Sequence, residues 1–382
     1  MGLTASTTSV AGQSMTSENV HVKSACTGEA GAEATVPEEE LQIVRDALFP
    51  HDLRVQRTLG AGSFGSVHAA YCDQTQNDVA VKVIDFSPDD LEEDRRAFRL
   101  EVSAMKALGD SDFIVSHERS WMNADKSGGY IVMELVDGQD LEEYLDQYGH
   151  RIGQTDAKRI GLRIAKALRD MHRAGWVHRD VKCGNVLMFT ESLSDDNGDI
   201  FSAVKLADLG LVATVGSKVE QVAGTLDFMP NNLVSSWEHE TKPPPPRPSD
   251  DMFAFACVMM EVMGAGYVLD HWNKTRRRRI KDGKSVERLR FPEDIAEKFH
   301  IRLIDALEAC WDDDRRKRPT AVEMVSLLEE LIEQQSDTKS QASILTDADD
   351  DNEEDDSTSI DIADQNEAGC IAERLKKRRR HD

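Results

Sequence analysis

The chain has 382 residues, of which 40% are hydrophobic, so it can bury the core of one large domain or two ordinary ones. Its formal net charge of −25 argues against direct binding to nucleic acid, because nucleic-acid-binding surfaces are usually basic. The 6 cysteines lie far apart without a C-x-x-C pair, which disfavours disulfides and zinc and predicts an intracellular protein of the cytoplasm, the nucleus or both.

The first segment, residues 1–50, is rich in small and polar residues and is predicted to be mostly disordered. It does not resemble a secretory signal, and nothing in the chain approaches the roughly 18 consecutive apolar residues of a membrane span. Gly2 and Ser6 match the N-myristoylation pattern, but no basic residue before Lys23 supplies a second membrane signal. Membrane contact is therefore expected only if Gly2 is lipidated.

Strand patterns come next in the chain. The sequences DLRVQRTLG, SVHAAYC, NDVAVKVIDF and YIVMELV are rich in β-branched residues that alternate with polar ones. Between the last two, SPDDLEEDRRAFRLEVSAMKAL predicts a helix with Ser87 as its N-cap and acidic residues in its first turn.

Helical patterns dominate the second half. TDAKRIGLRIAKALRDMHRAG has apolar residues at helical spacing and ends at Gly175, a typical C-cap. MFAFACVMMEVM is apolar on nearly every side, as in a helix at a domain centre, and FHIRLIDALEACW and TAVEMVSLLEELIEQ follow it. Strands first and helices second predict an α+β protein with a small β-rich lobe and a larger α-helical lobe.

Three further segments of the chain are rich in proline or in charged residues. The prolines at 243–248 form either a rigid surface loop or a docking motif for a proline-binding domain. The run RRRR at 276–279 is expected to be a solvated face. Residues 335–382 are predicted to be a disordered acidic tail, and its basic cluster at 374–380 is either a nuclear import signal or a counterweight to the acidic run.

The stretch GAGSFGSV at 60–67 raises the question of function. Glycine-rich turns are common, so this pattern alone is weak evidence of a phosphate-binding loop. The sequence VAVK then places Lys82 on a strand that follows the glycines, and Glu101 in the next helix could hold that lysine in position.

Two further motifs complete a set of groups suited to phosphoryl transfer. HRDVKCGN supplies Asp180 as a carboxylate near an incoming hydroxyl and Asn185 as a metal ligand, and ADLG supplies Asp208 as a second ligand. Transfer from ATP requires donors around the phosphates, a cation on their oxygens, magnesium ligands and such a carboxylate. All of them occur here in a workable order.

In this order and spacing the motifs resemble the eukaryotic protein kinases of the serine/threonine type, over residues 52–334. The resemblance implies a bilobal protein-kinase-like fold with an N-lobe at about 52–134 and a C-lobe at about 137–334. It also implies ATP and Mg²⁺ as cofactors, with Asn185 and Asp208 as metal ligands, and proteins bearing serine or threonine as substrates.

The resemblance assigns roles to single residues. Lys82, held by Glu101, would contact the α- and β-phosphates. Asp180 would accept or orient the substrate hydroxyl, and Lys182 would steady the γ-phosphate. Residues implied to contact the nucleotide, from the glycine loop through the gatekeeper and hinge to the ribose, are Leu59, Gly60, Ala61, Gly62, Ser63, Phe64, Gly65, Val67, Ala80, Lys82, Met133, Glu134, Val136 and Asp140.

Substrate class also follows from the resemblance. Lys182 stands two residues after Asp180, and Thr225 in AGTLDF occupies the position of a threonine that bridges the two in serine/threonine kinases. A pseudokinase scaffold of the same fold is the non-enzymatic alternative, and a small-molecule kinase is a further one. Leu209 replaces the phenylalanine of the D-F-G motif and would fill the same apolar slot.

One departure from the family pattern concerns FMPNN, where the family has M-A-P-E. The missing glutamate normally pairs with an arginine, here Arg318, which Asn231 or Asn232 would face. A buried guanidinium requires a carboxylate. Glu238 or Glu240 is expected to supply it.

The activation segment, Asp208 to about Pro230, is the expected site of control. Arg179 precedes the catalytic aspartate and requires an anion. A phosphate on Thr214 or Ser217 would order the segment through charge-assisted hydrogen bonds. Alternatively, Glu220 supplies the anion and the kinase is always on.

Overall fold

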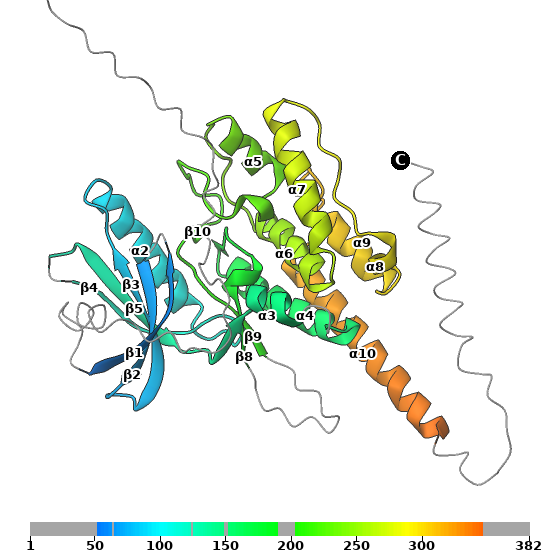
Figure 1. Ribbon diagram of the computed structural model, residues 1–382, viewed down its shortest axis with the longest axis horizontal. Coiled ribbons are helices and arrows are strands. Elements are labelled where there is room, and N and C mark those ends of the chain that lie inside the picture. The colour runs from blue at the N-terminus through cyan, green and yellow to red at the C-terminus, as the bar shows by residue number, and fades with distance from the viewer. Residues whose placement is uncertain (1–51, 63–64, 124, 149–151, 190–202, 347–382) are drawn as a thin grey trace, which may run out of the picture.

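The computed structural model describes residues 52–62, 65–123, 125–148, 152–189 and 203–346, and these form two lobes joined by the segment that follows β5 (Figure 1). The segment 1–50 with Gly2, the residues Ser63 and Phe64, and the basic cluster 374–380 lie outside the described residues. What the sequence indicates about them stays a prediction.

The N-lobe is an antiparallel sheet in the order β1-β2-β3-β5-β4 with one helix, α2, against it. Its elements are β1 (Leu53–Gly62), β2 (Gly65–Cys72), β3 (Asn77–Asp85), α2 (Leu91–Ala107), β4 (His117–Met122) and β5 (Gly128–Glu134). α2 packs closely, because a Cβ on Gly129 of β5 would lie 2.5 Å from the Phe98 ring of α2. The helix carrying Glu101 is thereby fixed against the strands that carry Lys82.

The C-lobe is mainly helical, with two small sheets, one of three strands and one of two, on the side nearer the N-lobe (Figure 1). Its strands are β6 (Gly138–Asp140), β7 (Trp176–Val177), β8 (Val186–Phe189), β9 (Ala203–Leu206) and β10 (Ala213–Thr214). Its helices are α3 (Leu141–Tyr148), α4 (Gln154–Arg173), α5 (Asn231–Glu238), α6 (Pro248–Val262), α7 (Gly266–Lys281), α8 (Glu293–Ala296), α9 (Ile301–Cys310) and α10 (Ala321–Thr346), with 3₁₀ turns η2 (Cys183–Asn185) and η3 (Leu226–Phe228). The expected α+β bilobal fold is confirmed.

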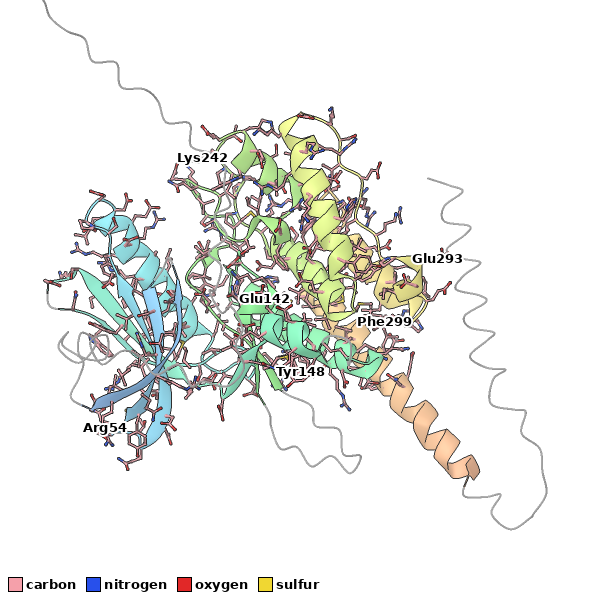
Figure 2. The ribbon with its side chains drawn as sticks, in the orientation of Figure 1. Arg54, Glu142, Tyr148, Lys242, Glu293 and Phe299 are labelled. Atoms are coloured by element: carbon pink, nitrogen blue, oxygen red, sulfur yellow. The ribbon has the colours of Figure 1, made fainter. Side chains whose placement is uncertain are left out.

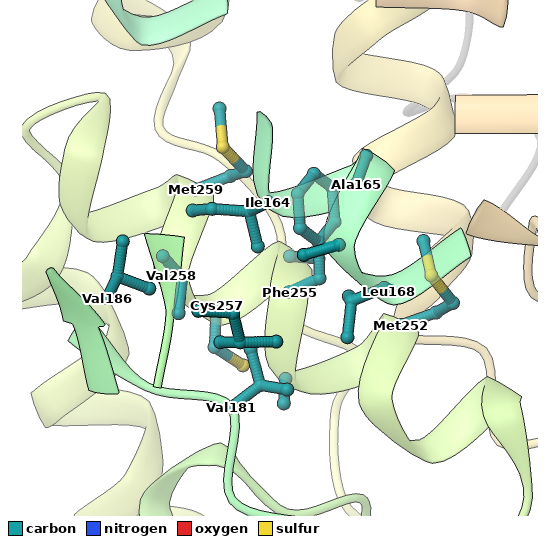
Figure 3. Packing of buried hydrophobic residues seen from close by; sticks show 14 of the residues in the cluster. Ile164, Ala165, Leu168, Val181, Val186, Met252, Phe255, Cys257, Val258 and Met259 are labelled. Atoms are coloured by element: carbon teal, nitrogen blue, oxygen red, sulfur yellow. The ribbon is translucent and has the colours of Figure 1, made fainter. Parts of the chain in front are cut away.

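The centre of the C-lobe is α6, which is buried on nearly every side as its sequence predicts. Figure 3 shows its Phe255 and Met259 packed with Ile164 and Leu168 of α4. Val181, from the loop between β7 and η2, belongs to the same cluster. The loop that carries Asp180 is thus anchored directly on the buried core of the lobe.

Three expectations differ from the structure. α2 begins at Leu91 after the N-cap Asp90, so Ser87 is not the cap; residues 87–90 form turns instead. α10 continues past residue 335 to Thr346, into the segment expected to be a disordered tail. The run at 276–279 lies on α7 and is not a uniformly solvated face, because Arg276 is fully buried.

The proline segment at 243–248 is built into the fold. Pro243 and Pro246 are buried, and the Pro246 carbonyl accepts a hydrogen bond from Gly216 N. In a polyproline helix, residues three apart share one face. The face shared by Pro243 and Pro246 is therefore turned inward, but Pro245, which shares a face with Pro248, is exposed, so the rigid-loop reading and the docking motif both stay predictions. Within the described part of the chain, no helix is long and apolar enough to cross a bilayer.

Candidate active site

The glycines of the motif lie where β1 pairs with β2, with Gly60 opposite Val67 and Gly62 opposite Gly65, and β2 pairs in turn with β3. Gly65 has a φ of +116°, and a Cβ there would lie 1.8 Å from the Val83 carbonyl oxygen, so only glycine fits. Val67 is paired with Lys82 across β2 and β3, and Ala80 lies two residues before Lys82 on β3. Leu59 and Ala61 on β1 are exposed. The sequence-predicted loop and lysine therefore meet on one sheet.

Lys82 joins the two lobes through two carboxylates. Its Nζ lies 2.7 Å from Glu101 Oε1 on α2 and 2.9 Å from Asp208 Oδ1 in the C-lobe. Burial alone would lower the pKa of Lys82, but the charges of Asp208 and Glu101 outweigh burial and raise it. Burial raises the pKa of Glu101, which the Lys82 ammonium opposes. Lys82 is thus held as a fixed cation, and Glu101 positions it as predicted.

Asp208 is the acidic end of this network. It occupies the left-handed region with a φ of +57°, and its carboxylate also accepts a hydrogen bond from Gly210 N. Burial would raise its pKa, but the Lys82 ammonium outweighs that effect and lowers it to about 2. Its side chain remains 41% exposed, so the carboxylate can accept a further ligand while it is ionised.

Asp180 lies at the centre of a second network. Its Oδ1 accepts hydrogen bonds from the backbone N and the Oγ1 of Thr225, each over 2.8 Å. Lys182 Nζ lies 3.2 Å from the same Thr225 Oγ1 and 3.3 Å from Asp180 Oδ2. Asn185 Nδ2 donates to the Asp180 carbonyl over 2.7 Å. The structure brings together all four of these sequence-predicted residues.

Asp251 holds this catalytic loop in shape, and sequence reasoning missed it. Its carboxylate accepts hydrogen bonds from the backbone N of His178 and of Arg179, both over 2.9 Å, and from His172 Nε2 over 2.8 Å. Arg179 needs this support because its φ is +72°. The signal for Asp251 is the acidic pair SDD at the start of a buried apolar helix, since buried carboxylates must be bonded.

The expected nucleotide-contact residues of the hinge follow β5. Met133 and Glu134 end that strand, and Glu134 is fixed by its carboxylate, which accepts from Ser116 N and Lys205 Nζ. Among the described residues, no backbone group accepts a hydrogen bond from the Val136 N–H, which leaves that donor for a ligand. Asp140 caps α3, because its Oδ1 accepts from Glu143 N over 2.9 Å.

The donor set at Asn185 and Asp208 fits magnesium. Asn185 uses its Nδ2 on Asp180, so its amide oxygen remains available, and Asp208 offers a carboxylate oxygen. Mg²⁺ is usually held by one or two protein oxygens together with phosphates and water. Among the described residues there is no group of three or more His, Cys, Asp or Glu that could hold a metal ion. Leu209 beside Asp208 is buried in the main core, as predicted.

The sequence matches the model of the family described as "Protein kinase domain" over residues 53–327. The chain belongs to the protein kinase family.

"Serine/threonine-protein kinase PKZ1" of Phytophthora infestans is 28% identical over 233 residues, 58% of this chain and 56% of that protein. "Serine/threonine-protein kinase STY17" of Arabidopsis thaliana is 24% identical over 292 residues, 75% of this chain and 45% of that protein. "Serine/threonine-protein kinase mos" of Patiria pectinifera is 25% identical over 286 residues, 73% of this chain and 75% of that protein. The chain thus spans little more than half the length of the first of these relatives.

The acidic partner of Arg318 in this chain is Asp250 and not Glu238 or Glu240. Arg318 Nη1 lies 3.6 Å from Asp250 Oδ1, and Asp250 also accepts from Arg315 Nε over 2.9 Å. Glu238 instead accepts from Arg277 on α7 over 3.1 Å, and Glu240 is exposed. Asp250 lies in the first turn of α6, whereas the family glutamate would stand at Asn231 or Asn232, at the start of α5. It therefore supplies the missing charge from another element.

The asparagines that replace the family glutamate do not bind Arg318 through any contact described here. Asn231 Nδ2 donates instead to Asp313 Oδ1 over 3.0 Å, and its Oδ1 is buried without a hydrogen-bond partner in the described structure. Arg318 makes its remaining bonds to the carbonyls of Asp312 and Ser249. The end of the activation segment is thus held differently from the family pattern.

Arg179 is bound by backbone carbonyls. Its guanidinium donates to Leu211 O over 3.3 Å and to Gln221 O over 3.4 Å, and burial lowers its pKa. Glu220 does not supply its anion, because both Glu220 oxygens lie 2.8 Å from Lys242 Nζ. That pair lies at the surface of the C-lobe, where Figure 2 labels Lys242. Glu220 therefore does not neutralise Arg179 in this structure, and the choice between a switched and a constitutive enzyme stays a prediction.

Glu261 of α6 lies below the catalytic loop, where Cys183 Sγ donates to its Oε2 over 2.8 Å. Burial raises the pKa of Glu261 to about 7, although the bond from Cys183 opposes the shift. The carboxylates of Glu142, Asp270 and Asp227 raise it further. Because the folded pKa lies above the ordinary value, protonated Glu261 stabilises the fold at low pH, and that stabilisation is lost as pH rises through about 7.

The variant Glu261→Gln, which stays neutral, is expected to gain stability over the wild type as pH rises from 5 to 8. The gain in unfolding free energy reaches up to about 3 kcal/mol, from about 1.4 kcal/mol for each pKa unit. Denaturant unfolding of both proteins at several pH values measures it. A difference that stays flat across this range would contradict the burial of an ionising Glu261.

Proposed function

We propose that this chain is a magnesium-dependent serine/threonine protein kinase that transfers the γ-phosphate of ATP to protein hydroxyls. The observation that carries the proposal is the position of Thr225 Oγ1, 2.8 Å from Asp180 Oδ1 and 3.2 Å from Lys182 Nζ. This bridge fixes both side chains beside the segment that a protein substrate would approach. The printed names of the relatives, which call them serine/threonine-protein kinases, support the same substrate class.

Each part of the site has a chemical task. Lys82 would bind phosphate oxygens, and its bond to Glu101 holds the ammonium beside Asp208. Asn185 and Asp208 would hold Mg²⁺, which neutralises charge on phosphate oxygens when bound. Asp180 would orient the substrate hydroxyl and accept its proton, and Lys182 would stabilise charge on the transferred group. Preorganised charges of this kind lower the barrier because they need not rearrange during the reaction.

The proposal is tested by incubating the full chain with radiolabelled ATP, Mg²⁺ and a mixed protein substrate, with the Asp180→Asn form as the blank. Phosphoamino-acid analysis should then find phosphoserine and phosphothreonine. No transfer by wild type, with retained nucleotide binding, would favour the pseudokinase scaffold. Label on a small molecule in place of protein would favour the small-molecule kinase.

We propose further that phosphate on the activation segment raises activity. Arg179 has carbonyl partners at 3.3 and 3.4 Å, longer than strong charge-assisted bonds, so a phosphate would bind it better. Thr214 is exposed on β10 and Ser217 is half-buried in the turn that follows. Both hydroxyls remain candidates, whereas Thr225 is committed to Asp180.

Mass spectrometry of active protein should find phosphate on Thr214 or Ser217, and phosphatase treatment should lower activity several-fold. Loss of the phosphate removes the charge-assisted bonds that order the segment. The double variant Thr214→Ala/Ser217→Ala should show the same loss. Full activity in the double variant would rule out this switch.

An intracellular location is likewise a proposal, supported by Cys72, Cys183, Cys257 and Cys310, which are all buried as free thiols. If the cluster at 374–380 acts in nuclear import, deleting it from a fluorescent fusion should shift the protein towards the cytoplasm. An unchanged distribution would leave the cluster as a counterweight to the acidic run.

A further inference from the structure

Arg276 of α7 is the most unusual charged residue of the C-lobe outside the catalytic groups. It is 0% exposed, yet it forms no ion pair with a carboxylate in the described part of the chain. Burial lowers its pKa to about 10, so it stays charged at neutral pH. A buried charge of this kind is costly unless hydrogen bonds compensate for its lost hydration. The bonds it does form therefore indicate its role.

Those bonds go to one short segment. Arg276 Nη2 donates to the Leu226 carbonyl and Nη1 to the Met229 carbonyl, each over 2.7 Å. One turn earlier on α7, Asn273 Nδ2 donates to the Asp227 carbonyl over 3.1 Å. α7 thus holds three carbonyls of the chain around η3 from one side.

The Arg276 guanidinium is also packed against an aromatic ring. It lies over the Trp272 ring with a centroid distance of 4.5 Å, and the Trp272 Nε1 donates to the Glu287 carbonyl over 2.8 Å. A planar guanidinium with two nitrogens aimed at two carbonyls is pre-organised in a way that a lysine ammonium cannot reproduce. The geometry therefore depends on arginine and not merely on positive charge.

The segment that α7 holds follows directly on the catalytic network. Thr225, which donates to Asp180, precedes Leu226, so a displacement of η3 displaces the threonine as well. A protein substrate whose hydroxyl lies at Asp180 must pass over this same segment. The segment's other anchor differs from the family pattern, because Asn231 replaces the glutamate that would pair with Arg318.

We propose that Arg276, assisted by Asn273, is a positioning residue for the protein substrate: it fixes the loop from Thr225 to Met229 as the surface on which the substrate lies. The inference rests on the proposed kinase function. It assigns the support of this substrate surface to α7, an element that lies far from the glycine-bearing strands β1 and β2 (Figure 1). Nucleotide binding should therefore be independent of Arg276.

The test compares Arg276→Gln, Arg276→Lys and Asn273→Ala with Arg278→Gln, a control that removes an exposed charge from the next turn of α7. For Arg276→Gln, the KM for a serine/threonine peptide should rise at least tenfold while the KM for ATP changes less than twofold. Arg276→Lys and Asn273→Ala should be intermediate, and Arg278→Gln should match wild type. A purely structural role would lower kcat through loss of active protein and leave both KM values unchanged.

A second readout does not need catalysis. Hydrogen exchange at the amides of Thr225, Phe228 and Met229 should accelerate in Arg276→Gln and stay unchanged in Arg278→Gln. Unchanged exchange in Arg276→Gln, or a peptide KM within twofold of wild type in Arg276→Gln and Asn273→Ala, would overturn the inference. If the wild type phosphorylates nothing but hydrogen exchange responds as expected, the proposed kinase function fails. The anchoring of the loop from Thr225 to Met229 by Arg276 then still holds.

Discussion

Replacing Lys82 with methionine is expected to lower phosphoryl transfer by about 100-fold or more while the fold remains intact. The change removes the cation that would bind phosphate oxygens, and loss of one preorganised charge contact typically costs that much. Methionine fills the buried path of the lysine side chain. Glu101 loses its partner, but its pKa is already raised by burial, so it can take up a proton instead of remaining as an uncompensated charge.

The matched control is Lys284→Met, which breaks a lysine–carboxylate pair of 2.9 Å at the surface, away from the site. Its activity should stay within twofold of wild type, because exposed pairs contribute little. Thermal unfolding with and without ATP checks that both variants are folded. Transfer by Lys82→Met at a rate near that of wild type would show that the role of this lysine is misassigned.

Local patterns predicted most of the fold and the reacting groups. The strand and helix of Lys82 and Glu101 could be read from alternation and helical spacing, and the loops of Asp180, Asn185 and Asp208 from short motifs. These residues are recognisable because the chemistry restricts both residue type and spacing. The structure adds their geometry, including the pair of 2.7 Å between Lys82 and Glu101.

Residues that support the site but lie far from it in the sequence were not predicted. Asp251 organises the catalytic loop across 72 and 73 positions of sequence, and Arg276 reaches the substrate segment across 47 and 50. For Asp251 the local signal is the acidic pair of SDD, but this pair and the arginine run are common surface patterns, so neither shows which member turns inward. Tertiary packing decides which member of each run turns inward. Within RRRR, that member is Arg276.

The substitute partner of Arg318 was misassigned for the same reason. Glu238 and Glu240 lie near FMPNN in sequence, and proximity along the chain favoured them. In the folded chain Glu238 faces α7 and bonds Arg277, whereas Asp250 at the start of α6 faces both Arg315 and Arg318. Asp250 had a simpler explanation as an acidic residue in a helix first turn, which stabilises the helix dipole.

The variant Asp250→Asn is accordingly expected to destabilise the kinase by about 3 kcal/mol or more, the usual cost of removing one partner of a buried pair. The Arg318 side chain is only 1% exposed, so it cannot recover hydration when its carboxylate is lost. Asparagine keeps the shape of the side chain and an oxygen for Arg247 N, which currently donates to Asp250 over 3.0 Å. The loss therefore reports mainly on charge.

Thermal unfolding measures this effect, and a loss of that size corresponds to a fall in Tm of roughly 6–12 °C for a domain of this size. The control is Glu330→Gln, whose partner Arg302 lies 2.6 Å away with both side chains about half exposed, and it should cost about 0.5 kcal/mol or less. Each variant removes one carboxylate charge, but the two differ in burial and in partners, since Asp250 faces both Arg315 and Arg318 whereas Glu330 faces Arg302. If they lowered Tm equally, the activation segment of this kinase would not depend on Asp250, and Arg318 would be satisfied by its carbonyl bonds to Asp312 and Ser249 alone.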